Sequence, residues 1–185
     1  MGMDKALLTL GGQTFLARAA QKLAGLVEQI SVIGPASLRA ELTLPVIEDE
    51  RAGSGPLGGI ATALGGAEQK WNLVLACDLP YLSEEWLRYL IARALTSSAE
   101  VVMPANENGW EPLCAMYHRS IAAKIVRKLD RGVRRVTEGL DGLAVEILPP
   151  SEWKKFDPDG RLFKNVNTPA DYAEAQAFFE GGPNP

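Results

Sequence analysis

The amino-acid sequence predicts an α/β protein with a mostly parallel sheet. Two observations support this prediction: short apolar runs alternate along the chain with stretches of helical periodicity, and the most apolar run, Asn72 to Cys77, is continuous. This pattern is typical of buried parallel strands covered by helices on both faces. The chain has 185 residues, of which 46% are hydrophobic and 23% charged, which is enough for one buried core. We expect residues 1–180 to form a single domain and residues 181–185 to form a flexible tail.

Capping residues mark the helix starts. Thr14 can cap a helix whose apolar positions run from Phe15 to Val27, and Ser83 and Thr168 can cap two later helices. Further helices are expected at 37–41, 57–68 and 120–129, and in a short segment that carries Arg134 and Arg135. Strands are expected at 29–33, 45–48, 72–77, 100–104, 112–117 and 143–148. The fourth and fifth of these strands are separated by a short polar loop, so we expect them to pair as an antiparallel ribbon.

The charge pattern excludes two classes of partner. The chain carries 19 basic and 23 acidic residues, a net charge of −4, and has no basic cluster, which excludes a nucleic-acid binder with a basic face. The longest uncharged run, 52–67, is too short and too rich in glycine to span a bilayer. Asp4 and Lys5 lie where a signal peptide would need apolar residues. We therefore expect a cytoplasmic protein without nucleic-acid or membrane partners.

The cysteines and the single histidine limit the chemistry further. Cys77 and Cys114 lie in apolar runs without CxxC spacing, which is typical of reduced thiols in a cytoplasmic protein. His118 stands beside Arg119 at a helix start, where a surface or capping role is expected. Because the sequence offers no Ser–His or Cys–His pairing, a triad hydrolase is excluded.

Four stretches place polar or glycine residues where the fold alone does not require them. In the first, Lys5 follows Gly2 and either reaches a phosphate as a flexible point charge or lies in solvent. In the second, Asp49 and the glycine loop from Gly53 to Gly59 follow the end of a strand. Exposed backbone N–H groups at such a place suit a nucleotide base or a phosphate, although glycine-rich turns are also common without a ligand.

The other two stretches lie later in the chain. Asp78 follows the most apolar strand, where open α/β sheets bind ligands, and a carboxylate there can hold Mg²⁺ together with substrate phosphates or can cap the next helix. Asn165 and Asn167 project from one side of an extended segment, either as turn residues or as ligand-binding amides. Outside these stretches, Arg134 and Arg135 either contact an anionic substrate or form a solvated helix face.

Together and in this order, these stretches resemble the molybdenum cofactor guanylyltransferases, a family of the nucleotidyltransferase superfamily. The matching segments are MGMDKALL, ED followed by GPLGGI, LACDLPYL, EPLCAMY, RRV and NVNTP. Each segment is weakly specific alone, but six collinear matches spread over almost the whole chain are specific. The resemblance implies a three-layer, Rossmann-like nucleotidyltransferase fold with a mostly parallel mixed sheet.

The resemblance also implies an activity and a set of site residues. The family transfers GMP from Mg-GTP to the terminal phosphate of molybdenum-molybdopterin, which gives the guanine dinucleotide cofactor and pyrophosphate. Molybdoenzymes or their chaperones would then be partners. The residues carried over are Lys5 and Asp78 for catalysis; Lys5, Asp49, Gly55, Gly59 and Asp78 for GTP; Asn165, Asn167, Arg134 and Arg135 for the second substrate; and Asp78 for Mg²⁺.

The chain departs from the family pattern at its start. In the family an apolar strand and a glycine-rich LAGGxSxR segment precede MGxDK, whereas this sequence begins at the methionine of that motif. The absent strand belongs in the middle of the sheet, so we expect its two neighbours to be unpaired and the core to be uncovered there. Gly34 stands where some relatives carry an asparagine near the nucleotide.

Two interpretations of this departure compete. The intact later motifs favour a cellular protein that is longer than this sequence; the other interpretation is a truncated relative without turnover. A cytidylyltransferase or another nucleotidyltransferase of the same superfamily, and a non-catalytic nucleotide- or pterin-binding protein, remain alternatives.

Overall fold

The structure is a computed structural model that describes residues 5–40, 42–49, 51 and 53–181. The strands are β1 (Thr9–Leu10), β2 (Gln13–Thr14), β3 (Val32–Gly34), β4 (Val46–Glu48), β5 (Trp71–Leu75), β6 (Val101–Asn106), β7 (Gly109–Trp110), β8 (Cys114–His118) and β9 (Val145–Leu148). The α-helices are α1 (Phe15–Leu23), α2 (Gly55–Gly65), α3 (Glu84–Thr96), α4 (Ala122–Asp130), α5 (Val136–Gly139), α6 (Pro150–Trp153) and α7 (Pro169–Gly181). Short 3₁₀ helices are η1 (Lys5–Leu7), η2 (Ala36–Ala40), η3 (Arg119–Ile121) and η4 (Lys154–Phe156).

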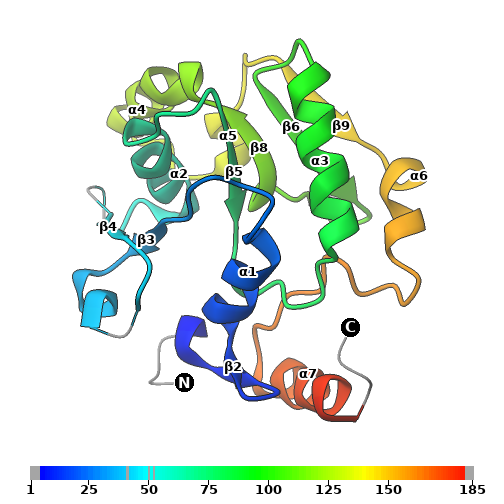
Figure 1. The fold of residues 1–185 in the computed structure, drawn as a ribbon. Helices are drawn as coiled ribbons and strands as arrows, with labels where there is room; N and C mark the ends of the chain where they lie inside the picture. Colours follow the sequence, from blue (N-terminus) through cyan, green and yellow to red (C-terminus); the bar gives the residue numbers. More distant parts are fainter. Residues whose placement is uncertain (1–4, 41, 50, 52, 182–185) are drawn as a thin grey trace.

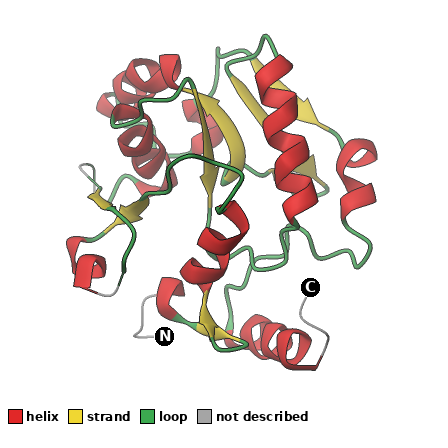
Figure 2. Ribbon diagram, viewed as in Figure 1, coloured by secondary structure: helices red, strands yellow, loops and turns green. Residues whose placement is uncertain are grey.

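The elements form three layers, with helices on both faces of a central sheet (Figures 1 and 2). One apolar cluster joins α2, α4 and α5 to one face of the sheet, where Leu57 and Ile60 meet Val101 and Tyr117. A second cluster joins α3 and α6 to the other face, around the fully buried Trp86. The predicted three-layer α/β architecture is therefore confirmed.

The sheet is mixed because β8 runs against its neighbours. The strand order is β5, β8, β6, β7, with β9 also paired to β6. β8 lies between β5 and β6 and pairs antiparallel with both, whereas β9 is parallel to β6. The predicted mixed sheet and the predicted antiparallel ribbon of 100–104 with 112–117 are thus confirmed. The reading of 72–77 as a central parallel strand is wrong, because β5 has a single described neighbour and that neighbour is antiparallel.

β5 has one unpaired edge. Ala76 N–H donates to Leu113 O (2.8 Å) and Arg119 N–H to Lys70 O (2.8 Å), so the even-numbered residues of β5 bond to β8. The odd-numbered residues point their backbone groups to the opposite edge, where no described strand pairs. β3 and β4 form a separate parallel pair on that side (Figure 1), and α2 contacts both pieces of sheet. The predicted interruption of the sheet is present at this place.

The residues of β5, next to the interruption, are less buried than those of β6 and β8. All five residues of β5 are only half-buried, although they are among the most apolar in the chain, whereas the first four residues of β6 and of β8 are buried. The side chains of β5 therefore cover less of the core than a strand with two neighbours would.

Two predicted boundaries are wrong near this interruption. Thr14 caps α1 as expected, accepting a hydrogen bond from Ala17 N–H (3.0 Å), but the helix ends at Leu23, since Gly25 takes a φ of +85° and turns the chain. The strand expected at 29–33 is three residues long, Val32–Gly34, because its pairing with β4 fixes its length. Smaller end shifts occur in α2, η2 and β9.

Several smaller expectations can also be checked. Cys77 and Cys114 are both free thiols. His118 caps η3, with its Nδ1 accepting from Ser120 N–H (3.3 Å). None of the described helices is long and apolar enough to cross a membrane. Most of the predicted tail, 182–185, lies outside the described residues.

Candidate active site

Asp78 and Glu111 lie close to each other at the carboxyl edge of β5. The antiparallel register pairs Leu75 with Cys114, and the hydrogen bond between Ala76 and Leu113 continues it. Both segments turn beyond this point, and Asp78 comes close enough to Glu111 for the two carboxyl groups to interact electrostatically. Burial, and then the negative charge of Asp78, raise the pKa of the Glu111 carboxyl above its usual value, against the lowering effect of its bond from Asn106. The sheet therefore brings two carboxylates together where one was predicted.

This pair of carboxylates suits a divalent cation. Two acids that face each other repel, and a cation between them removes that repulsion. Among the described residues no group of three or more His, Cys, Asp or Glu side chains could hold a metal alone. A metal here would therefore take its remaining ligands from water and from a phosphate-bearing substrate, as Mg²⁺ commonly does. Asp78 was the predicted metal residue, and its surroundings fit that ion.

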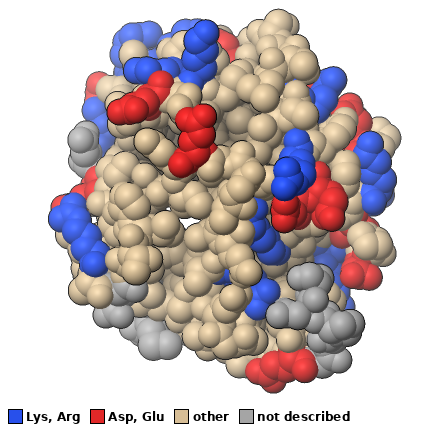
Figure 3. Space-filling model, in the orientation of Figure 1, with Lys and Arg blue, Asp and Glu red and all other residues tan. Residues whose placement is uncertain are grey.

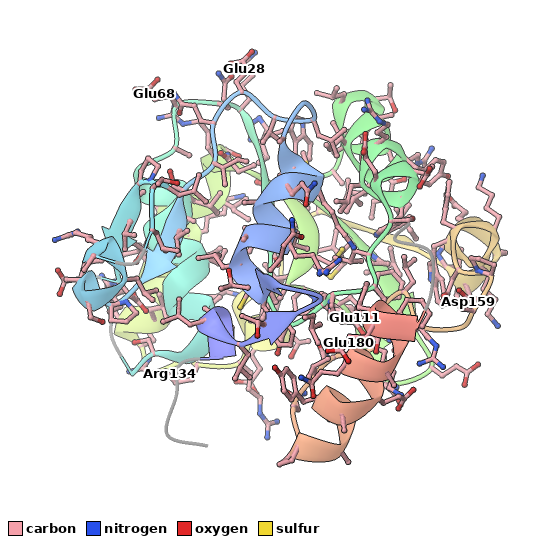
Figure 4. The ribbon with its side chains drawn as sticks, turned by 60° about the horizontal axis from the view of Figure 1, so that its bottom comes forward. Glu28, Glu68, Glu111, Arg134, Asp159 and Glu180 are labelled. Carbon is pink, nitrogen blue, oxygen red and sulfur yellow. The ribbon has the colours of Figure 1, made fainter. Side chains whose placement is uncertain are left out.

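Glu111 is a candidate metal-binding residue that the sequence did not single out. It begins the EPLCAMY segment, which was used only for the family resemblance. It follows the β6–β7 hairpin, and its N–H donates to Pro104 O (3.0 Å). Figure 4 turns this edge of the sheet toward the viewer and shows Glu111 near its middle. If the antiparallel pairing of β5 with β8 were known, an acid just before β8 would indicate a second carboxylate near Asp78.

The segment that carries Asn165 and Asn167 is docked against Asp78. Val166 N–H donates to the backbone oxygen of Asp78 (3.0 Å), and the Val166 side chain is 1% exposed while both asparagines are exposed. The two amides therefore lie on one outer side of an extended segment, as predicted, next to the candidate metal residue.

A capping box follows this segment directly. Asp171 N–H donates to the Thr168 hydroxyl (3.1 Å), while the Asp171 carboxylate accepts from the N–H groups of Thr168 (2.8 Å) and Asn167 (3.1 Å). Hydrogen bonds to the Asp171 carboxylate lower its pKa: the Thr168 side chain has the largest effect, followed by the backbone N–H groups of Thr168 and Asn167. The predicted cap of the last helix is confirmed, and it fixes the backbone at Asn167.

Asp49 holds the glycine loop in shape. Its Oδ1 accepts hydrogen bonds from Arg51 N–H (3.0 Å) and from the Thr62 hydroxyl on α2 (3.1 Å). Gly53 and Gly55 have φ values of +83° and +64°, a region that glycine adopts without strain. Ser54 precedes α2 without a side-chain capping bond, so its hydroxyl does not satisfy the first N–H groups of the helix. The loop therefore offers backbone donors beside a fixed carboxylate.

Gly58 sits where a side chain has no room. A Cβ there would lie 2.9 Å from Ser54 Cβ and 3.2 Å from Arg51 O. We expect Gly58→Ala to displace the loop and to weaken nucleotide binding about tenfold or more, with a loss of about 1–3 kcal/mol in unfolding free energy. Denaturant unfolding and nucleotide titration would measure both effects.

The matched control for this variant is on the same helix. A Cβ at Gly65 meets nothing within 4 Å. Gly65→Ala is therefore expected to leave binding unchanged and to stabilise the helix by roughly 0.5–1 kcal/mol. Equal nucleotide affinities for the two variants would show that the close approach at Gly58 has no bearing on the ligand.

Arg134 and Arg135 are not on a helix, contrary to prediction. α4 ends before Gly132, whose φ is +89°, and α5 begins only at Val136, with Arg135 as its N-cap residue. Arg134 Nη1 donates to Leu129 O (2.9 Å) and to Val133 O (3.0 Å). Figure 4 shows Arg134 away from Glu111, at the edge of the molecule.

The Arg135 side chain extends into solvent, whereas the Arg134 backbone lies next to the glycine loop. The Arg135 side chain is 82% exposed and lies 3.7 Å from the Glu138 carboxylate. A Cβ on Gly55 would lie 3.9 Å from Arg134 O, so the Arg134 backbone adjoins the glycine loop. Asp49, Gly55 and the Arg134 backbone therefore lie together around the glycine loop. Asp78, Asn165 and Asn167 lie together after the carboxyl end of β5.

Three further expected residues can be placed in part. Lys5 begins η1, and its side chain lies outside the described residues. Gly34 ends β3, and a Cβ there would lie 3.0 Å from Leu38 Cδ1, so the turn favours glycine. Gly59 lies on α2, where a Cβ would make an ordinary contact with Ile33 at 3.8 Å.

A mixed sheet with β8 reversed between β5 and β6, covered by helices on both faces, is the fold of solved nucleotidyltransferases. Residues 1–144 match the family model described as a MobA-like NTP transferase domain, and the chain belongs to this family. It is 31% identical over 179 residues to a probable molybdenum cofactor guanylyltransferase of Bacillus cytotoxicus, a match that covers 94% of this chain and 88% of that relative.

Solved structures agree with this assignment. Molybdopterin-guanine dinucleotide biosynthesis protein A from Archaeoglobus fulgidus matches with a TM-score of 0.84 and 26% identity, over 98% of this chain and 93% of that one. A Mycobacterium tuberculosis H37Rv protein, solved in complex with manganese, has the same fold at a TM-score of 0.62 and 20% identity, over 95% and 92% of the two chains. The resemblance found in the sequence is confirmed, and the chain is an enzyme of the nucleotidyltransferase class.

Proposed function

We propose that the chain transfers GMP from GTP to the terminal phosphate of molybdopterin, with Mg²⁺ as the metal. A phosphate oxygen of molybdopterin attacks the α-phosphorus of GTP, the bond from that phosphorus to the oxygen bridging to the β-phosphate breaks, and pyrophosphate leaves. The opposed carboxylates of Asp78 and Glu111 are the observation that best supports this reaction. No general base is needed, because the attacking phosphate is already ionised near pH 7.

The residues at the sheet edge would act by position and charge. Asp78 and Glu111 would hold the metal, whose charge, when bound, offsets the charge on the α-phosphate and the leaving pyrophosphate. A protein of the same fold was solved in complex with manganese, which supports the use of a divalent metal. Lys5 would contact a nucleotide phosphate, a role that rests on the family motif alone.

The glycine loop is the proposed guanosine side. Asp49 uses Oδ1 for the loop and α2, and no described residue donates to its Oδ2. That oxygen can accept N–H groups of a guanine base, while Gly55 and Gly59 let the base lie close to the backbone. A cytosine base offers fewer N–H donors to a carboxylate, which favours GTP over CTP.

The second substrate would lie on the other side of Asp78. Asn165 and Asn167 present exposed amides there, and we assign them to molybdopterin. Arg135 follows Arg134, whose backbone adjoins Gly55, so its exposed side chain would meet an anionic part of the substrates beside the glycine loop rather than beside the asparagines. Arg134 already bonds two backbone carbonyls, so we assign it the support of the segment beside Gly55.

Nucleotide protection tests the choice of base. With ligand at about a hundred times its dissociation constant, binding adds about 2.7 kcal/mol to the unfolding free energy. For a chain of this size that corresponds to a rise in Tm of roughly 5–10 °C. We expect Mg-GTP to produce such a rise and Mg-CTP a smaller one. A rise with CTP that equals or exceeds the rise with GTP would contradict the guanine assignment.

Asp49→Asn tests, by the same measurement, whether the Asp49 carboxylate recognises the guanine base. The asparagine oxygen can keep both hydrogen bonds of the loop, while the amide replaces the acceptor proposed for guanine. The variant should therefore unfold at nearly the wild-type temperature without ligand and should lose most of its preference for GTP.

Release of pyrophosphate from GTP and molybdopterin separates an enzyme from a non-catalytic binding protein, since a binding protein would show protection without product.

A further inference from the structure

A polar cavity lies outside the candidate active site. It has a volume of about 480 Å³, is partly open to solvent, and is lined by α1, the start of α3, the 156–162 loop and α7. None of the residues assigned above to GTP, metal or molybdopterin lines it. The volume is within the usual range for small-molecule sites.

Two cations without a counter-charge line this cavity. Arg18 is 8% exposed; its Nη2 donates to Leu10 O (2.9 Å), its plane lies over the Phe179 ring, and its Nε has no partner among the described residues. One helical turn later, Lys22 Nζ donates to Pro80 O (2.7 Å) and to Leu82 O, which leaves one of its protons unused. Neither side chain forms an ion pair with a described carboxylate.

This arrangement is unfavourable without an anion. Burial lowers the pKa of both groups, and burial followed by the charge of Arg18 lowers the pKa of Lys22 to about 8. Buried cations in proteins are normally paired, because an unpaired charge loses its hydration without compensation. The two side chains also repel each other. A bound anion would remove both penalties at once.

The other charged groups around the cavity do not supply that anion. Asp157 Oδ1 accepts the N–H groups of Arg161 (2.7 Å) and Leu162 (2.9 Å), Glu84 pairs with Arg88, and Arg161 pairs with Glu174. Glu85 and Asp159 are exposed. Figure 3 shows blue atoms near the middle of the face it presents, next to red ones. Arg18 and Lys22 therefore have no ion-pair partner among these described acids, each of which is exposed or already accepts other hydrogen bonds.

Aromatic rings form much of the wall. Tyr81 stacks on Phe179 with ring centroids 5.5 Å apart and meets Phe178 edge-on at 5.3 Å. Phe156 lines the side next to α3. Such walls favour a planar apolar body over a bare inorganic ion.

We propose that this cavity binds a small aromatic anion, with its carboxylate or phosphate beside Lys22 Nζ and the Arg18 guanidinium and its planar body along the aromatic wall. The ligand is identified by this chemistry: one anionic head group on a planar apolar body. The proposal is independent of the GTP reaction, since it involves neither Asp78 nor the glycine loop.

Direct titration tests the proposal. Phenyl phosphate, benzoate and the uncharged benzyl alcohol would be titrated into the chain without nucleotide, by calorimetry. We expect at least one of the two anions to bind at millimolar concentration or below, and benzyl alcohol to bind at least tenfold more weakly. The tighter of the two anions identifies the head group. Absence of binding by both anions, or equal binding by benzyl alcohol, would overturn the proposal.

Two variants locate the binding. Arg18→Gln and Lys22→Gln keep hydrogen-bond donors for the backbone carbonyls but remove the charges, so each should weaken anion binding about tenfold. Arg127→Gln, at an exposed position on α4, is the matched control and should bind like the unmodified chain. Unchanged affinity in both cavity variants would contradict the assignment of the site.

A measurement on the unmodified chain covers the case in which a variant does not fold. Benzoate keeps its charge between pH 7 and pH 9, whereas Lys22 loses its proton in this range, because its pKa is lowered to about 8. Benzoate affinity should therefore fall as the pH rises through this range. A constant affinity would overturn the role given to Lys22.

Discussion

Replacing Asp78 by asparagine is expected to reduce metal-dependent nucleotidyl transfer by about a hundredfold to a thousandfold. The change removes one of two opposed carboxylates and leaves a site with half the negative charge for a divalent cation, at the place where charge develops in the reaction. The bond from Val166 N–H goes to the backbone oxygen of Asp78 and is unaffected by the substitution. Pyrophosphate release from GTP at saturating Mg²⁺ would measure the loss.

Two further variants make this experiment specific. Glu111→Gln should also lower the rate and weaken manganese binding, which electron paramagnetic resonance can follow without turnover. Glu107→Gln removes an exposed acid from the turn between β6 and β7, and should change neither quantity. Wild-type turnover by the Asp78 variant would show that the metal is held elsewhere.

Replacing Trp86 by alanine should be the most destabilising single change in the core of the molecule. The side chain is fully buried on α3, its Nε1 donates to Cys114 Sγ (3.4 Å), and its ring meets those of Tyr89, Phe156 and Phe163. Truncation of such a residue costs about 3–5 kcal/mol, because apolar contacts are lost and a cavity remains. For a chain of this length Tm should fall by roughly 6–20 °C.

The control lies on the same helix. Leu95 is 66% exposed, and Leu95→Ala should change the unfolding free energy by less than about 0.5 kcal/mol. Chemical denaturation of the two variants under one set of conditions compares them directly. A loss below about 1 kcal/mol for Trp86→Ala would mean that the packing around α3 does not depend on this ring.

Local signals were sufficient for much of the fold. The caps at Thr14, Ser83 and Thr168 act on backbone donors within three residues, so the sequence around each helix start contains all the information needed. The positions of Asp78 after β5 and of Asn165 and Asn167 just before α7 were also predictable, since each adjoins a strong periodic signal. Their roles in the reaction stay predictions.

Features that depend on contacts between distant segments were not predictable in this way. Glu111 comes near Asp78 only through the pairing of β5 with β8, which no local pattern specifies. β3 is short because its described partner is the equally short β4. No local pattern distinguishes Arg18 and Lys22 from the other polar positions of α1, because their burial results from α7 and from the segment after β5 packing over them.

The unpaired edge of β5 gives this strand two kinds of amide in alternation. The N–H groups of Asn72 and Val74 are held by β8, while those of Trp71, Leu73 and Leu75 point to the edge where no described strand pairs. Native β-sheets normally protect or cover such an edge, because its donors and acceptors can pair with any extended chain. Along these five residues, every second amide therefore has no strand partner among the described residues, and β8 is the one described strand whose backbone hydrogen bonds hold β5 in the sheet.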